Sequence, residues 1–281
     1  TDHNEPLFGR ADNILCLRAF KIGVLKQIME DLASGYSNDD LLALYTLTGG
    51  IPKYVELFCD NQALTIDKMY DFVFSENSLF IDEGRNLLIT EFGKNYGTYF
   101  SILSEIANGH YTQGEIESAL GGTAIGGYLS KLENVYNLIT RERPIFAKPG
   151  TKKNVRYVIG DNFLNFWFKY IEQNRSYIEL QNFDDLRQLA KADYPTYSGR
   201  VLEKYFKQKL AETGGFKEIG SWWETKSSIG KQRINSYEID IVALKSSGKK
   251  ALIAEVKRVP ENNYSLSLIH ISEPTRPRLI S

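Results

Sequence analysis

Acidic residues and one lysine near the C-terminus have the types and spacing that a divalent-metal site for phosphodiester cleavage requires. Glu203 lies in a segment with helical apolar spacing, Asp240 lies in an apolar run, and Glu255 and Lys257 flank Val256 in a second such run. Mg²⁺ prefers oxygen ligands and retains several waters, so Asp240 and Glu255 are candidate metal ligands. Lys257 could orient a metal-bound water or help to deprotonate it for attack on a phosphodiester.

Two strands are expected to position these groups. The runs 237–245 and 249–259 are rich in apolar and β-branched residues, and the short turn Ser246-Ser247-Gly248 joins them. Because side chains alternate between the two faces of a strand, Glu255 and Lys257 should share one face, about 7 Å apart along the strand. The sequence therefore predicts a hairpin that carries the acid-x-lysine pair on one face.

Asp240 would face this pair from the neighbouring strand, and the Val256 carbonyl would be a further oxygen ligand. Glu203, on its helix, would reach the metal directly or through a water. All four side chains, Glu203, Asp240, Glu255 and Lys257, are therefore candidate catalytic residues. Charged residues are also common on the solvated face of a sheet, so a set of ordinary surface charges remains the alternative.

The same region resembles the C-terminal domain of archaeal-type ATPases. The resemblance is carried by Phe216–Trp223, Glu238–Leu244 and Ala254–Lys257. That domain is regarded as a relative of the restriction-endonuclease-like nucleases, whose motif is one acid followed by an acid-x-lysine. The resemblance implies a truncated restriction-endonuclease-like α/β core over residues 196–264, with Mg²⁺ as its cofactor. Because this core also survives in proteins that do not cut, a domain that only binds DNA or a protein partner stays open.

The N-terminal part resembles archaeal-type ATPases of the AAA/STAND group, on the runs Glu5–Arg10 and Tyr45–Tyr54. In that group a Gly-Arg pair follows the last core strands, and a Gly-Gly-x-Pro turn lies in the helical lid over the nucleotide. The resemblance implies that residues 1–90 are the end of the ATPase domain and its lid. Its nucleotide-binding candidates are Arg10, Gly49, Gly50 and Pro52.

These candidates make physical sense, but a second interpretation is open. Glycines let the backbone turn and approach a ligand closely, and Pro52 suits the first position of a helix. Arg10 could bind a phosphate with its planar guanidinium. Alternatively, Arg10 is a surface charge and the glycines only separate two helices. Because the sequence has no G-x-x-x-x-G-K-S/T run, we expect ATP to bind a longer parent protein and not this chain alone.

The middle of the chain has a winged-helix pattern, expected over residues 91–160. A helix is predicted for 99–107, and Thr112 with Glu115 forms a capping box that opens a second helix to 120. A third helix is predicted for 123–132, and strands for 137–141 and 155–159 around a turn at Pro149-Gly150. Three helices followed by a hairpin form a variant of helix-turn-helix.

The predicted hairpin is basic, which indicates a DNA partner. Its candidate phosphate-binding residues are Arg141, Arg143, Lys152 and Lys153, with Lys148 and Arg156 nearby. Positive charge alone is a sequence-independent signal. A solvated hairpin on a structural spacer is therefore the alternative.

Linker helices are expected over residues 161–195, beginning with the aromatic run 161–171, whose helically spaced rings predict a core. Residues 266–276 resemble a translated sequencing adapter, so we expect native sequence to end near Tyr264 and 265–281 to be a non-native tail.

Composition narrows the class of protein. Hydrophobic residues make up 42% and charged residues 25%, so a packed core is feasible in a mixed α/β protein (α+β overall). The net charge is -1, so any contact with nucleic acid depends on local patches. Cys16 and Cys59 are too few for a disulfide framework, and the sequence has no run of 18 apolar residues. We expect a cytoplasmic protein without a membrane span, in an oligomeric state that the sequence does not indicate.

Overall fold

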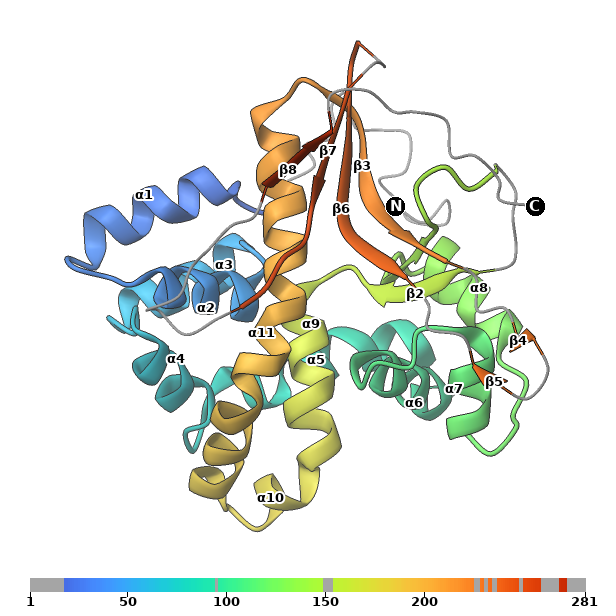
Figure 1. Cartoon of the computed structure of the whole chain (residues 1–281). Coiled ribbons are helices and arrows are strands. Elements are labelled where there is room, and N and C mark those ends of the chain that lie inside the picture. Colours follow the sequence, from blue (N-terminus) through green and yellow to red (C-terminus); the bar gives the residue numbers. More distant parts are fainter. Residues whose placement is uncertain are drawn as a thin grey trace, which may run out of the picture.

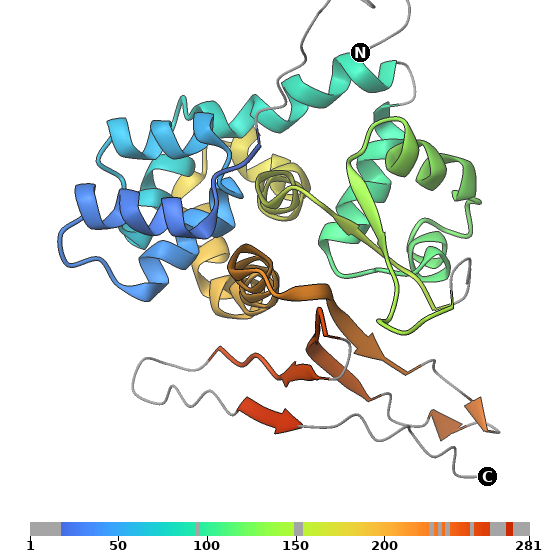
Figure 2. The same cartoon turned by 90° about the horizontal axis from the view of Figure 1, so that it is seen from above.

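A computed structural model describes residues 18–93, 96–148, 154–224, 228–229, 232–233, 237–247, 250–258 and 268–271. The chain combines many helices with small antiparallel sheets, which confirms the expected mixture of helix and sheet. Figure 2 shows the N-terminal helices and a second helical module on either side of the central helices α9 and α11. In the described ranges, no helix has the length and apolar character needed to cross a membrane.

The N-terminal part is helical: α1 (Ile22–Leu32), α2 (Asn38–Thr48), α3 (Pro52–Asp60), α4 (Ile66–Val73) and α5 (Leu79–Phe92). Helix α2 begins at a capping box in which the Ser37 hydroxyl accepts the Asp40 N–H and the Asp40 carboxylate accepts the Ser37 N–H. Pro52 is the first residue of α3, as expected. Most of α2 is buried because other helices surround it.

The middle module contains α6 (Tyr96–Ala107), α7 (Gln113–Ala119), α8 (Gly126–Asn134) and the strands β1 (Ile139–Glu142) and β2 (Arg156–Ile159). The capping box of Thr112 and Glu115 is confirmed. Strands β1 and β2 pair antiparallel, with Ile139 opposite Ile159. The third helix begins at Gly126 and not at Thr123, because the Glu117 carboxylate holds the preceding turn by accepting the Ile125 N–H at 3.2 Å.

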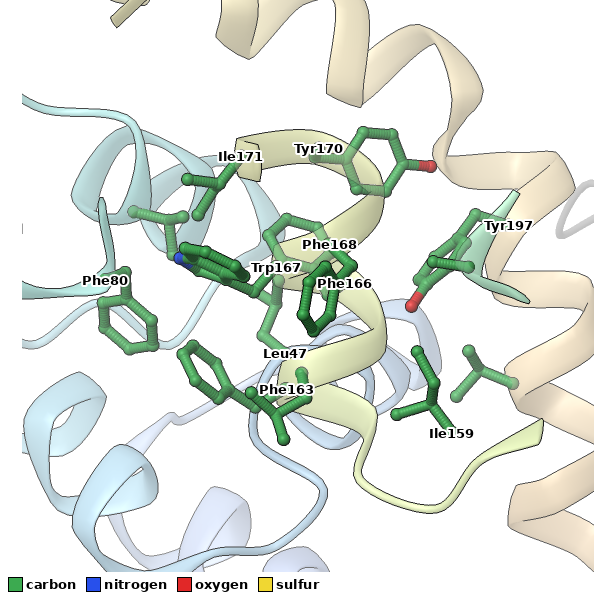
Figure 3. Close-up of a cluster of buried hydrophobic side chains, with 14 of the residues drawn as sticks. Leu47, Phe80, Ile159, Phe163, Phe166, Trp167, Phe168, Tyr170, Ile171 and Tyr197 are labelled. Atoms are coloured by element: carbon green, nitrogen blue, oxygen red, sulfur yellow. The ribbon is translucent and has the colours of Figure 1, made fainter. Parts of the chain in front are cut away.

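The central segment contains α9 (Asn162–Phe166), the π-helical turn η2 (Trp167–Ile171), η3 (Glu172–Asn174), α10 (Arg175–Glu179) and α11 (Phe183–Thr213). The aromatic run lies in the core, as predicted, and its rings meet Phe80 on one side and Tyr197 on the other (Figure 3). Trp167 is fully buried and donates its indole N–H to the Ile81 carbonyl at 3.1 Å. A Cβ at Gly84 would lie 2.3 Å from the Trp167 ring, so this contact requires glycine.

The C-terminal sheet has the order β3-β6-β7-β8, with β3 (Phe216–Trp223), β6 (Glu238–Lys245), β7 (Ala251–Ala254) and β8 (Leu268–Ile271), all antiparallel. Strands β4 (Ser228–Ile229) and β5 (Gln232–Arg233) form a separate pair. Helix α11 runs beside the sheet (Figure 1) and crosses the expected boundary at residue 195 without interruption, with Pro195 inside it. Strand β8 lies in the segment expected to be a non-native tail.

Candidate functional site

Asp240 and Glu255 adjoin the last residue pair that joins β6 and β7. That pair is Ile241 with Ala254, and Asp240 and Glu255 are the neighbours of its two members. The Asp240 carboxylate accepts the N–H of Val256, the residue after Glu255, at 2.7 Å. The two acids therefore come from adjoining chain segments at the end of the β6–β7 ladder.

The second strand is shorter than the sequence predicts. Strand β7 ends at Ala254, so the expectation that it continues through Glu255 and Lys257 is wrong. The cause is a side-chain contact, because Asp240 Oδ2 accepts the Val256 N–H at 2.7 Å. A carboxylate thus takes the place that a strand carbonyl would have in the ladder, and residues 255–258 leave the sheet.

Glu255 and Lys257 lie on the same side, but they contact each other. Lys257 Nζ is 3.1 Å from Glu255 Oε1, and 63% of the Glu255 side chain and 72% of the Lys257 side chain are exposed. An ion pair between exposed groups is weak, so it leaves both side chains able to move to a ligand. Their assigned roles stay predictions.

Glu203 lies on α11 where the helix faces the sheet. The pKa of Glu203 is raised to about 7, mainly by burial. The ammonium of Lys207 opposes this rise, and the carboxylates of Asp240 and Glu238 contribute to it. The structure therefore brings the helix acid within electrostatic reach of the strand acid. A pKa this far above the usual value of a glutamate is a property that functional carboxylates often have.

Lys207 and Ser221 connect the helix to the strands. Lys207 Nζ lies 3.9 Å from Glu203 Oε2 and donates to Ser221 Oγ at 2.5 Å. The Ser221 hydroxyl in turn donates to the Asp240 carbonyl at 2.9 Å. Lys207 was not predicted as a site residue from the sequence, although its position four residues after Glu203 places both on one helix face.

Arg156, on β2 of the middle module, binds the edge of this acidic cluster. Its guanidinium donates to both Glu238 carboxylate oxygens, at 2.5 and 3.0 Å, and lies 4.2 Å from the centre of the Trp223 ring. The Trp223 indole N–H donates to the Asn154 side chain at 3.0 Å. The β1–β2 hairpin is therefore attached to the C-terminal sheet. Glu238, two residues before Asp240, was not predicted as a site residue from the sequence.

The basic residues of the hairpin differ in their surroundings. Arg141 donates to Glu133 at 2.5 Å, and its guanidinium lies 5.4 Å from the centre of the Tyr157 ring, so it is engaged within the module. Arg143 is exposed. Lys152 and Lys153, with the turn at Pro149-Gly150, lie outside the described residues.

The Gly49-Gly50 turn packs against the protein's own backbone. Both glycines have positive φ, +59° and +78°, and a Cβ at Gly50 would lie 2.7 Å from the Phe20 carbonyl oxygen. The Phe20 N–H also donates to the Gly50 carbonyl at 2.7 Å. These contacts explain the glycines without a ligand, so the nucleotide-binding role of Gly49, Gly50 and Pro52 stays a prediction. Arg10 lies outside the described residues.

The donor chemistry fits Mg²⁺ at two carboxylates. Among the residues that the structure describes, no group of three or more His, Cys, Asp or Glu side chains gathers in metal-binding geometry. Protein Mg²⁺ sites commonly use one or two carboxylates and keep several waters. Asp240 and Glu255 could supply the two carboxylates. The pKa of Glu203 is raised mainly by burial, with smaller contributions from Asp240 and Glu238, so the shift does not by itself indicate a cation.

Comparison with known proteins finds a family match for part of the chain. Residues 167–264 match a family model described as archaea bacterial proteins of unknown function. The chain is also 34% identical over 268 residues to an uncharacterized protein of Methanocaldococcus jannaschii, covering 91% of this chain and 55% of that protein. The chain thus spans about half the length of this archaeal relative. No solved structure matches this chain.

Proposed function

We propose that residues 183–258 carry a Mg²⁺-dependent site of the restriction-endonuclease-like type that cleaves DNA phosphodiesters. The observation that supports it most is the convergence of acids from three elements. Asp240 accepts the N–H of Val256, next to Glu255, at 2.7 Å, and the Asp240 carboxylate contributes to the raised pKa of Glu203 on α11.

Each residue has a distinct role in this proposal. Asp240 and Glu255 hold the cation, which supplies positive charge and an activated water when it is bound. Glu203, with a pKa of about 7, can take up or release a proton near neutral pH. Lys257 orients the attacking water. Lys207 keeps a positive charge beside Glu203 through its contact with Ser221.

The middle module supplies the DNA-binding part of the proposal. Its order of three helices and a hairpin is that of a winged helix. Arg143, Lys152 and Lys153 are the residues we assign to phosphate contacts. Arg141 and Arg156 instead fix the hairpin to α8 and to the sheet, so the wing has a defined position beside the acids.

The N-terminal helices belong, in this proposal, to the lid of an AAA/STAND-type ATPase domain in a longer cytoplasmic protein. The support is the Gly-Gly-x-Pro turn, where two left-handed glycines precede a helix that begins with Pro52. ATP bound in that longer protein would regulate the DNA-acting part.

A second candidate function is a STAND-type ATP-driven switch whose nuclease-like domain binds DNA or a protein partner without cutting. One observation favours it. Glu255 and Lys257 form an exposed ion pair with each other, so two residues of the acid-x-lysine motif contact each other and not a metal site.

The two candidates are separated by incubating supercoiled plasmid with Mg²⁺, with and without ATP, using the chain and the longer protein proposed to contain it. Cleavage that is abolished by Asp240→Asn and by Lys257→Ala supports the nuclease. Lys250→Ala is the matched control, because Lys250 is an exposed lysine at the other end of β7. Equal cutting by the wild type and both variants refutes the catalytic assignment, and DNA retention without cutting favours the switch.

A further inference from the structure

In the part of the chain that the structure describes, residues 255–258 pair with no strand. After Ala254 the chain leaves β7 and runs beside α11 toward α2 (Figure 1). Two contacts hold it there. The Asp240 carboxylate binds the Val256 N–H at 2.7 Å, and the Arg258 guanidinium binds Asp39 Oδ2 at 2.8 Å.

The Arg258 contact is well placed to act as an anchor. Only 16% of the Arg258 side chain is exposed, and its guanidinium lies 5.0 Å from the centre of the ring of Tyr194, a buried residue of α11. Asp39 lies in the first turn of α2, between the capping-box residues Ser37 and Asp40. Asp39 and Tyr194, the two partners of Arg258, therefore belong to packed helices. Separating a paired, mostly buried guanidinium from such partners is costly.

We infer that Arg258 is a positioning residue that fixes Glu255 and Lys257 relative to Asp240 by fastening their segment to α2 and α11. The inference rests on the proposed function and extends it to a residue outside the acid-x-lysine motif. The side chains of Glu255 and Lys257 are themselves exposed, so packing around them does not fix their positions. Anchors at Val256 and Arg258 lie on either side of Lys257, and the Val256 anchor directly follows Glu255.

The test compares the wild type with Arg258→Ala, Arg258→Lys and Asp39→Asn. Arg175→Ala is the matched control, since Arg175 pairs with Asp82 at 3.2 Å, is 28% exposed and, like Arg258, has a buried guanidinium nitrogen without a partner among the described residues. Each protein is assayed for plasmid cleavage in single turnover with Mg²⁺, for Mn²⁺ affinity, for hydrogen exchange in peptides covering residues 250–258, and for its melting temperature.

We expect Arg258→Ala to slow cleavage at least tenfold at saturating DNA, well below its melting temperature, and to speed exchange in 255–258. Asp39→Asn should have a similar effect, and combining it with Arg258→Ala should add little, because both remove the same contact. Arg258→Lys should restore part of the rate, since lysine keeps the charge but not the planar stacking. Arg175→Ala should change neither the cleavage nor this exchange.

Two results would overturn the inference. One is cleavage and exchange in Arg258→Ala that equal those of the wild type. The other is a loss of cleavage that follows only the fraction of unfolded protein, with unchanged exchange in 255–258. If the wild type itself does not cut with Mg²⁺ or Mn²⁺, the proposed function fails. Exchange and Mn²⁺ affinity then still decide whether Arg258 positions this segment.

Discussion

The raised pKa of Glu203 predicts that this carboxylate destabilises the fold at neutral and alkaline pH. Burial and the nearby acids raise the pKa from 4.5 to about 7, so the folded chain holds the Glu203 proton more tightly than the unfolded chain does. The destabilisation of the folded chain by Glu203 is therefore absent below pH 4.5, grows as pH rises from 4.5 to 7, and is complete above pH 7.

The size of this effect follows from the pKa difference. At about 1.4 kcal/mol per pKa unit, the cost above pH 7 is at most about 3.5 kcal/mol. Because 31% of the Glu203 side chain is exposed, solvent screening reduces this to about 1–2 kcal/mol. Glu203→Gln keeps the shape and removes the charge, so it should stabilise the chain by that amount at pH 8 and by almost nothing at pH 4.

The assay is a series of thermal or denaturant melts of wild type and Glu203→Gln between pH 4 and pH 8. A gain of 1 kcal/mol corresponds to about 2–4 °C in melting temperature for a chain of this size class. The control variant is Glu218→Gln, which makes the same substitution at an exposed glutamate on β3. A stability difference that is the same at every pH, or of opposite sign at pH 8, would refute the reasoning. With Mg²⁺ present at pH 8, the wild type should gain more stability than Glu203→Gln.

Further predictions concern Lys207, Gly84 and Arg143. Lys207→Ala removes the charge that lowers the pKa of Glu203, so the pH at which Glu203 ionises should move upward, as a pH titration followed by NMR would detect. Gly84→Ala should destabilise the chain by about 1–3 kcal/mol in denaturant melts, because its Cβ would overlap the Trp167 ring; a neutral result would contradict the described packing. Arg143→Ala should weaken DNA binding and reduce its salt dependence by about one counterion, measured by fluorescence anisotropy at several salt concentrations. An unchanged salt slope would exclude Arg143 as a phosphate contact.

Local features of the fold could be predicted from the sequence because short-range signals determine them. The capping box of Thr112 and Glu115 involves residues three positions apart, and Pro52 starts a helix because its ring fixes φ. The aromatic run 161–171 could be assigned to the core because so many large rings need burial.

The contacts that organise the candidate site could not be predicted from short-range signals in the sequence. Arg156 and Glu238 are 82 residues apart, and Asp39 and Arg258 are 219 apart, so only the assembled fold brings them together. The early end of β7 has the same origin. A run of apolar residues indicates a strand, but it does not reveal that the side chain of Asp240 takes the backbone N–H of Val256.

Helix α11 bears both Tyr194, which lies beneath Arg258, and Glu203, about 14 Å further along the axis at 1.5 Å per residue. Pro195 falls between them and lacks the N–H that would complete a turn of the helix. The missing hydrogen bond would have reached the carbonyl of Lys191, so the helix is weakest in the turn 191–195, which contains Tyr194. Bending in this turn would shift Tyr194, and with it the support of Arg258, relative to Glu203.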